Sequence, residues 1–418
     1  MASILFYTSP AKGHLYPILG AALKLHLRGH DVHIRTLSGE VERVRSLGLA
    51  CEPIAAEIEA REMDDWKGNS PLQAIELAMK TFGDRSVPEV DDLQSAIRQS
   101  GPDMLVIDTN SWGAQAAAEA SGLPWALFQP YFTYLPERGV PPFGPGFPPM
   151  KGPAGRMRDK ILSKLIFSKL NKLALPAVNP VRLKLGLKPL STIYEMLNRP
   201  DLVLYYTSAE LDYPREQWPA NFRFVGPGLW SPEAEPPAWL DDAKLPIALV
   251  TCSTERQSDR PILEAALESL PGEGFFVVAT SAAYKPEELE VKDLLNVRLE
   301  RFIPHNPVVK RASVVICHGG MGITQRALFH GVPVVVIPFG RDQLEVARRV
   351  EFAGAGVRLM PKKLTGSTLK KAVQDALSLK EGAVRIASSL RASGSDQTVA
   401  ALIEELQTQR QQQPEASL

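Results

Sequence analysis

The chain of 418 residues has only three cysteines, no net charge and no long apolar run. Three scattered thiols are too few for a disulfide framework or a cysteine-based zinc site, and they favour a reducing, cytoplasmic setting. Lys+Arg and Asp+Glu both number 47, so no charge excess indicates nucleic acid as a partner. No window approaches the roughly 18 uncharged apolar residues of a membrane span, and we expect no integral membrane protein.

Several motifs of common enzyme classes are missing as well. The sequence has no Asp-x-Asp pair and no close cluster of histidines and carboxylates, so it predicts no metal. It also lacks the Gly-x-Ser-x-Gly elbow of serine hydrolases and the Gly-Lys-Ser/Thr of a P-loop.

What the sequence does contain is an alternation of short β-branched runs with helical patterns, which is typical of βαβ units and parallel sheets. The expected strands of the first part are Ser3–Thr8, Asp31–Thr36, Met104–Ile107, Trp125–Phe128 and Leu202–Tyr206. Those of the second part are Ile247–Cys252, Phe275–Thr280, Val297–Leu299, Ser313–Cys317 and Val332–Ile337. The pattern predicts an α/β protein of two doubly wound, Rossmann-like domains that face each other across a cleft.

Composition places the boundaries. Glycines and prolines crowd the polar stretch 226–245, which is typical of a linker. We therefore expect an N-terminal domain over 1–225 and a C-terminal domain over 246–395. Residues 396–418 are expected to form a C-terminal helix and a tail, polar from Gln407 on and disordered.

One stretch departs from the alternation. Between Lys151 and Lys188 there are ten Lys or Arg residues against one acid, Asp159, and 156–173 has apolar residues on one helical side. A helix packed on its domain with a solvated basic face explains this pattern. Docking on an anionic membrane surface is the alternative.

The most informative segment is Cys317–Thr324, Cys-His-Gly-Gly-Met-Gly-Ile-Thr, which follows an expected buried strand and opens a helix. Its glycines allow the backbone to approach a ligand, and free N–H groups at the helix start attract phosphate. The pair Asp342-Gln343 follows the next strand and suits sugar hydroxyls. These features predict a nucleoside-diphosphate site, whereas His318 alone would equally fit a packed core histidine.

The order His-Gly-Gly, Gly-Val-Pro, Pro, Asp-Gln resembles the signature of the family 1 nucleotide-sugar glycosyltransferases, the inverting group that includes plant and macrolide enzymes. Gly13-His14-x-x-Pro17 is similar to the family's N-terminal loop, and Phe302–His305 lies where the family has Trp-x-Pro-Gln. The resemblance extends over nearly the whole chain. It implies the GT-B fold, with the sugar donor held mainly by the C-terminal domain and the acceptor by the N-terminal one.

The resemblance implies that His14 is the general base and that Asp108 orients it. The residues support this, because His14 follows the first strand at the mouth of the domain and an imidazole accepts a hydroxyl proton near neutral pH. Asp108 ends another strand, where a carboxylate would fix the tautomer and stabilise the imidazolium. The alternative for Asp108 is an N-cap of the following Ala-rich helix.

The donor residues are carried over from the same resemblance. His318 and the glycine turn would contact the diphosphate of a UDP- or dTDP-linked sugar, Phe302 would stack on the base, and Asp342 would hold the sugar. No metal is implied. The implied donor-binding residues are Gly13, Ser253, Thr254, Phe302, Ile303, His318, Gly320, Met321, Gly322, Ile323, Thr324, Arg326, Asp342 and Gln343.

Arg326 departs from the pattern, since relatives usually carry there a Glu that grips both ribose hydroxyls. A guanidinium only donates hydrogen bonds. We therefore expect Arg326 not to demand a 2′-hydroxyl. It either turns toward the donor phosphates, pairs with an acid such as Glu345 or Glu351, or points to solvent.

The acceptor site is expected along the aromatic and proline-rich segment Phe128–Phe147, whose rings suit a flat aglycone or a lipid. The same rings would also serve as core. The expected acceptor-binding residues are Trp112, Tyr131, Phe132, Tyr134 and Phe143.

Together these patterns predict an inverting transfer of a hexose from a nucleoside-diphosphate sugar to a hydroxyl of a hydrophobic small molecule or lipid. The first alternative is a catalytically silent homologue that binds a nucleotide or hydrophobic ligand and assists a partner enzyme. The second is a sugar-nucleotide epimerase, which would need further carboxylates in the cleft. We expect a cytoplasmic protein, with peripheral contact to the inner membrane surface if the basic helix docks there.

Overall fold

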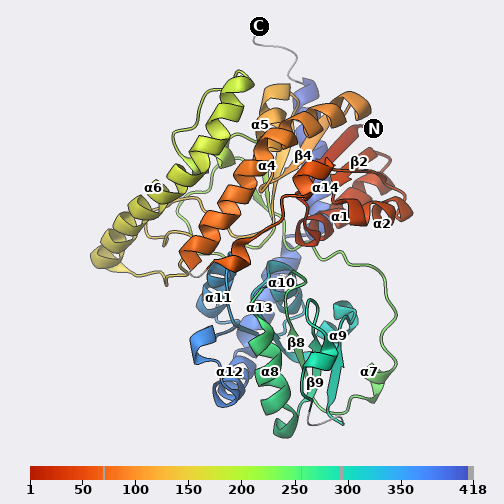
Figure 1. Cartoon of the computed structure of the whole chain (residues 1–418), viewed down its shortest axis with the longest axis vertical. Helices are drawn as coiled ribbons and strands as arrows, with labels where there is room; N and C mark the ends of the chain where they lie inside the picture. Colours follow the sequence, from red (N-terminus) through yellow and green to blue (C-terminus); the bar gives the residue numbers. More distant parts are fainter. Residues whose placement is uncertain (69–70, 256, 292–294, 413–418) are drawn as a thin grey trace.

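The computed structural model describes residues 1–68, 71–255, 257–291 and 295–412, and it contains two parallel sheets, one in the upper and one in the lower part of Figure 1. The N-terminal sheet has the order β3-β2-β1-β4-β5-β6-β7. Its strands are β1 (Ser3–Tyr7), β2 (Asp31–Thr36), β3 (Ala50–Pro53), β4 (Met104–Asp108), β5 (Trp125–Gln129), β6 (Leu202–Tyr205) and β7 (Phe222–Phe224). In the central strands nearly all residues are apolar and buried, as expected where helices cover both faces of a parallel sheet.

The C-terminal sheet has the order β10-β9-β8-β11-β12-β13. Its strands are β8 (Ile247–Thr251), β9 (Phe276–Thr280), β10 (Val297–Glu300), β11 (Ala312–Cys317), β12 (Val334–Val336) and β13 (Gly356–Arg358). In both sheets the strand order reverses beside the first strand, which places ligands beyond the carboxyl ends at that point. The predicted α/β architecture of two doubly wound sheets is confirmed.

Every predicted strand is present, with ends that differ by at most two residues. The sequence analysis missed β3, β7 and β13, which are three or four residues long and lie at sheet edges. Edge strands of this length carry too few residues for an alternation or an apolar run. The predicted linker separates the strands of the N-terminal sheet from those of the C-terminal sheet. The domain boundaries themselves stay predictions.

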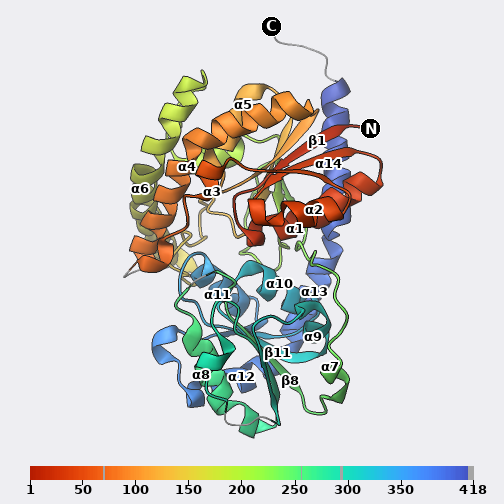
Figure 2. The ribbon, with the colours of Figure 1, turned by 45° about the vertical axis from the view of Figure 1, so that its right-hand side comes forward.

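The chain crosses between the two parts twice. The segment after β7, which carries α7 (Trp239–Asp242), runs down one side of the molecule to β8 (Figure 1). At the other end, α14 (Ser395–Gln412) leaves the C-terminal part and packs against α1 (Lys12–Leu27) beside the N-terminal sheet (Figure 2). Helix α14 continues past Gln407, where disorder was expected, and residues 413–418 lie outside the described residues.

The helices of the N-terminal part include three that pack together, α4 (Pro71–Ser100), α5 (Trp112–Ser121) and α6 (Gly152–Lys184). Those of the C-terminal part include the pair α8 (Arg260–Ser269) and α12 (Gly366–Ser378) and the pair α10 (Met321–Phe329) and α13 (Lys380–Ala392). Helices α9 (His305–Arg311) and α11 (Gln343–Phe352) complete the cleft side. These elements leave loops of both parts facing one another.

A buried group of charges joins the two parts. The Nε of Arg349, on α11, lies 2.5 Å from Oδ1 of Asp212, which follows β6. Its Nη1 lies 2.5 Å from Glu345, and its guanidinium lies over the rings of Phe132 and Tyr213, 4.4 and 4.2 Å from the ring centroids. All three charged side chains are at most 2% exposed. Although burial disfavours a charged carboxylate, Arg349 holds the pKa of Asp212 below its usual value.

We predict that Arg349→Met destabilises the protein by about 3–5 kcal/mol, because it removes the guanidinium that contacts both buried carboxylates, Asp212 and Glu345. Urea unfolding followed by tryptophan fluorescence measures the change. Arg311→Ala is the control: its ion pair with Asp241 is exposed, and its loss should cost less than about 1 kcal/mol. Equal small losses in both variants would contradict the prediction.

Candidate active site

The central cleft between the two sheets is a cavity of about 2370 Å³, lined by loops of both parts. Pockets for one small ligand usually measure about 300–1,000 Å³, so this cavity has room for two substrates. Its N-terminal wall includes His14, and its C-terminal wall includes His318 and Asp342.

His14 and Asp108 meet at the N-terminal wall. His14 lies in the first turn of α1, directly after β1, and Asp108 is the last residue of the neighbouring strand β4. The Nδ1 of His14 lies 3.0 Å from Oδ1 and 2.9 Å from Oδ2 of Asp108. The His14 side chain is 17% exposed and that of Asp108 is fully buried. The pair therefore presents only the imidazole to the cleft.

Asp108 is held as an anion by its hydrogen bonds. It accepts from the backbone N–H and hydroxyl of Ser9, at 3.1 and 2.9 Å, and from the backbone N–H of Asn110, at 2.8 Å. Burial alone would raise its pKa, but His14 and these donors lower the pKa of Asp108 below its usual value. The N-cap of α5 is Ser111, so the alternative interpretation of Asp108 as that cap does not hold.

The other nitrogen of His14 faces Asn110, which the sequence analysis missed. The Nδ2 of Asn110 lies 3.2 Å from Nε2 of His14, and its Oδ1 accepts from the hydroxyl of Tyr131 at 2.8 Å. Donation in one direction along this chain assigns the imidazole proton to Nδ1 and leaves a lone pair on Nε2. Burial opposes the imidazolium, but Asp108 outweighs it and raises the pKa of His14. The arrangement suits a general base.

The glycine turn lies on the C-terminal wall, between β11 and α10. Gly319 has φ +100°, and a Cβ there would lie 2.8 Å from Val336. Gly320 caps α10, and a Cβ there would lie 2.8 Å from Nε2 of His318. The positive φ favours glycine at 319, and the absence of a side chain at 320 leaves the space beside the His318 ring and the N–H groups at the start of the helix open to an anion.

His318 is nearly buried beside this turn, 7% exposed. Burial lowers its pKa to about 4, despite Asp259, whose Oδ2 lies 3.8 Å from its Nδ1. Among the described residues, no hydrogen-bond partner reaches that nitrogen. Because Nδ1 is buried on the side of Asp259, the nitrogen suited to donate to a phosphate oxygen is Nε2, which lies beside Gly320 of the glycine turn.

All other predicted donor residues line the cleft except Thr324. Thr324 is 1% exposed and points back at Cys317, with its Oγ1 3.6 Å from the sulfur. It lies in the second turn of α10, on the side that faces the sheet. Phe302, by contrast, is 73% exposed on the rim of the cleft and is free to stack on a flat ring.

Asp342 and Gln343 differ in what they offer. The Gln343 side chain accepts from the backbone N–H groups of Phe339 and Gly340 and donates to Gln257, so it holds the shape of its own turn. Asp342 caps α11, and in the described part of the chain no other residue donates to its carboxylate. Burial raises its pKa to about 6. Asp342 is therefore the carboxylate of this turn that remains for a ligand.

Arg326 takes none of the three expected orientations. Its Nη1 donates to Asn306 of α9, and its Nη2 lies 3.4 Å from the backbone oxygen of Trp230 in the linker. Burial lowers its pKa to about 10. Glu345 is instead committed to Arg349 and Glu351 to Arg348. The partners of Arg326 are therefore a side chain of α9 and a backbone oxygen of the linker, which no local sequence pattern predicts.

Four of the five expected acceptor residues line the cleft: Trp112, Tyr131, Tyr134 and Phe143. Phe132 is fully buried and packs on Arg349 instead, so it belongs to the core. The cleft continues into an apolar chamber between α4 and α6, which the sequence analysis missed although both helices are amphipathic. The apolar chamber is lined by Ile75, Met79, Phe82, Leu165, Ile166, Leu170 and Leu173.

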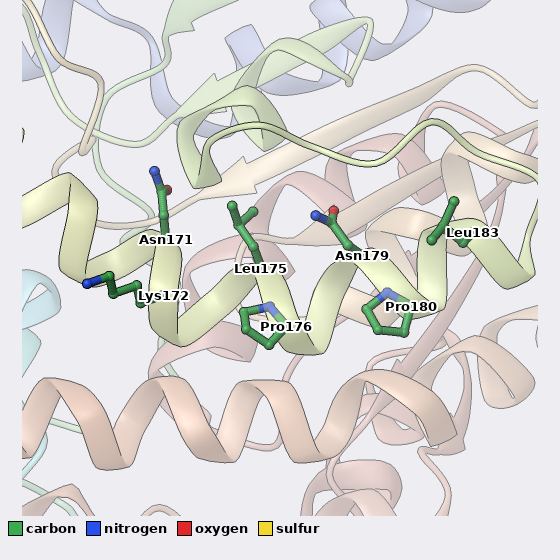
Figure 3. Close-up of a pocket in the computed structure, with 7 residues that line it drawn as sticks. All are labelled: Asn171, Lys172, Leu175, Pro176, Asn179, Pro180 and Leu183. Carbon is green, nitrogen blue, oxygen red and sulfur yellow. The ribbon is translucent and has the colours of Figure 1, made fainter.

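A second hollow of about 480 Å³ lies along α6 and shares no residue with the cleft (Figure 3). Its residues Asn171, Leu175 and Asn179 lie along one side of the helix (Figure 3). Both asparagines are engaged, Asn171 by the N–H of Ile193 and Asn179 by the backbone of Leu190. These hydrogen bonds attach α6 to the segment that follows it.

Within the described ranges, no three His, Cys, Asp or Glu side chains converge as ligands for a metal ion. None of the helices there is long and apolar enough to cross a membrane.

Comparisons with known proteins show the family and the fold of this chain. Residues 272–406 match the C-terminal domain of proteins like the erythromycin biosynthesis protein CIII. A 4'-demethylrebeccamycin synthase of Lentzea aerocolonigenes is 31% identical over 395 residues, which cover 90% of this chain and 92% of that protein. The glycosyltransferase of kitacinnamycin superposes with a TM-score of 0.75 at 22% identity, over 97% of this chain and 99% of its own. The Streptomyces sp. SF2575 glycosyltransferase SsfS6, complexed with thymidine diphosphate, superposes with a TM-score of 0.68 at 19% identity, over 97% and 100%.

Proposed function

The chain belongs to the family 1 nucleotide-sugar glycosyltransferases of the macrolide type, and from this premise we propose that it is an inverting enzyme that moves a hexose from a UDP- or dTDP-sugar to a hydroxyl of a hydrophobic small molecule or lipid. One observation carries the proposal: a histidine–carboxylate pair, His14 and Asp108, opposes a glycine turn with an unused histidine, His318, across a single cleft. A base and an anion site on opposite walls suit a direct displacement.

In this mechanism the acceptor hydroxyl replaces the amide of Asn110 at Nε2 of His14. The imidazole takes the hydroxyl proton as the oxygen attacks the anomeric carbon, and Asp108 stabilises the imidazolium. The oxygen enters from the N-terminal wall and the diphosphate leaves toward the C-terminal wall. A single displacement with this geometry inverts the anomeric configuration.

The leaving diphosphate gains negative charge, which His318 and the N–H groups at the start of α10 stabilise. These donors take the place of a metal, so we expect no metal requirement. Phe302 stacks on the nucleotide base, and Asp342 binds sugar hydroxyls. The pairing of His14 with Asp108 favours this enzyme over a silent homologue, since a binding protein has no need of a buried carboxylate behind an imidazole.

We predict that His14→Ala lowers kcat by about 10²–10⁴-fold on an oxygen acceptor, with donor affinity unchanged. Asp108→Asn should lower it less, because the side-chain shape survives. Since the pKa of His14 is raised and the neutral form is active, wild-type kcat/KM should fall as pH drops through a value above 6.5. Asp108→Asn should shift this fall to lower pH.

Steady-state kinetics from pH 5 to 9 and calorimetric donor binding measure these effects. His33→Ala is the matched control, because His33 pairs with Asp31 outside the cleft. Wild-type turnover of His14→Ala would reject the base assignment and, with it, the proposed mechanism.

The donor is the subject of a separate prediction. Because Arg326 only donates and is bound to Asn306 and the linker, it does not test for a 2′-hydroxyl. The enzyme should therefore use a dTDP-sugar at least as well as its UDP counterpart, and Arg326→Glu should shift the preference toward the ribonucleotide. The ratio of the two kcat/KM values measures this. A native preference against the deoxy donor of 100-fold, about 2.7 kcal/mol, would contradict it.

For the acceptor, we propose an apolar aglycone or lipid that occupies the apolar chamber. The outer face of α6 supports delivery from a membrane surface. Met157, Ile161 and Leu165 are 53–63% exposed there, and Leu165 also lines the cleft. The exposed cations Arg156, Lys160 and Lys164 follow the same helical turns, with no acidic partner among the described residues. Such a face suits peripheral binding to anionic lipid.

We predict that the protein cosediments with phosphatidylglycerol vesicles and not with phosphatidylcholine vesicles. Lys160→Glu with Lys164→Glu should abolish binding, because two attractive charges become repulsive. Lys370→Glu with Lys371→Glu makes the same charge change on α12 and should leave binding intact. Binding that survives the first pair would show that α6 only packs on its own domain.

A further inference from the structure

The turn that carries Asp342 has an unusual backbone. Arg341, directly before it, has φ +54°. A residue other than glycine rarely adopts this left-handed backbone conformation. The strain that it causes persists only where the surrounding structure holds the residue in place. The side-chain contacts of Arg341 can hold the backbone in this conformation.

Arg341 is held by two carboxylates. Its Nε and Nη2 lie 2.7 and 3.0 Å from the two oxygens of Asp65, and its Nη1 lies 2.5 Å from Glu255. The contact with Asp65 is the bidentate arrangement that fixes a guanidinium plane most firmly. The side chain of Asp65 is only 5% exposed and that of Arg341 25%, so water screens the pair little.

The bond to Asp65 spans the cleft. Asp65 begins the short helix η2 (Asp65–Lys67), between β3 and α4 of the N-terminal part, whereas Arg341 lies between β12 and α11. Both residues line the central cleft. His14 and Asp342 face the same cleft from its two walls, near enough for each charge to act on the other's pKa. The ion pair therefore fixes the spacing over which a sugar would lie.

We propose that Asp65 is a positioning residue for the donor sugar: by gripping Arg341 in its left-handed conformation, it presents Asp342 to the sugar at a fixed place relative to His14. This inference rests on the proposed function. His318, Gly320 and Phe302, which are assigned to the nucleotide, all belong to the C-terminal part and need no such support. Recognition of the sugar thus depends on Asp65, and recognition of the nucleoside diphosphate does not.

The test compares two ligands in calorimetry, the nucleoside-diphosphate sugar and the free nucleoside diphosphate. Asp65→Asn should weaken binding of the sugar nucleotide about tenfold and leave binding of the free diphosphate within about twofold. With saturating acceptor, kcat should fall about 10–100-fold through misplacement of the sugar. Asp64→Asn is the matched control: within the described residues its carboxylate pairs with the exposed Lys67 and not with Arg341, and all its values should match the wild type.

A second pair of variants tests the backbone itself. Arg341→Gly and Arg341→Ala both remove the ion pair, but only glycine adopts φ +54° without strain. Arg341→Gly should therefore retain more sugar-nucleotide affinity than Arg341→Ala. These two variants also carry the test if Asp65→Asn does not fold.

Equal weakening of both ligands by Asp65→Asn, or no weakening of either, would overturn the proposal, as would equal affinities of the two Arg341 variants. The binding measurements do not depend on turnover. If His14→Ala kept wild-type turnover, the proposed mechanism would fail while the ligand difference at Asp65 remained, so the two failures are distinguishable.

Discussion

The relative placement of the two sheets depends on the buried pairing of Arg349 with Asp212. Neither charge is stable in the interior alone, so the halves that carry them must meet in the one orientation that joins both. Glu345 extends the constraint, since its second oxygen accepts from the backbone N–H groups of Gly144 and Gly146, at 2.8 and 2.7 Å. The loop that brings Phe143 to the acceptor wall is thereby attached to the helix that begins beside Asp342. Buried charge therefore acts together with the apolar core that the two parts share in holding the walls of the cleft in place.

The parts of the site that lie at the carboxyl end of a strand could be predicted from the sequence. His14 and Asp108 lie far apart in the chain, yet each follows a central strand, and the carboxyl ends of parallel neighbours meet at one edge. The glycine turn at His318 could be predicted in the same way, because the backbone conformation of Gly319 favours glycine. In both cases the signal is local, and the fold class supplies the remaining geometry.

The rest could not be predicted, because it depends on contacts between distant segments. Whether Phe132 faces the cleft or the core is decided by Arg349, more than two hundred residues away. The orientation of Arg326 is decided by Asn306 of α9 and by the backbone oxygen of Trp230 in the linker. Asn110 was missed for another reason: its neighbour Asp108 explains the strand end, and no pattern distinguishes a residue that bonds the base from one that caps a helix.

This division follows the chemistry of the two substrates. In the proposed function a diphosphate is recognised by backbone N–H groups and one imidazole, which a short motif supplies within a single domain. The sugar and the acceptor oxygen must instead be aligned with each other to within a fraction of an ångström for displacement to occur. Alignment of that kind requires groups from both walls, and each such group here is held by a partner across the cleft or by a neighbour such as Asn110. The amide of Asn110 lies 3.2 Å from Nε2 of His14, the nitrogen that takes the proton in the proposed mechanism. Under that mechanism an acceptor hydroxyl must take the place of the amide, so that activation of the base is tied to the substrate that needs it.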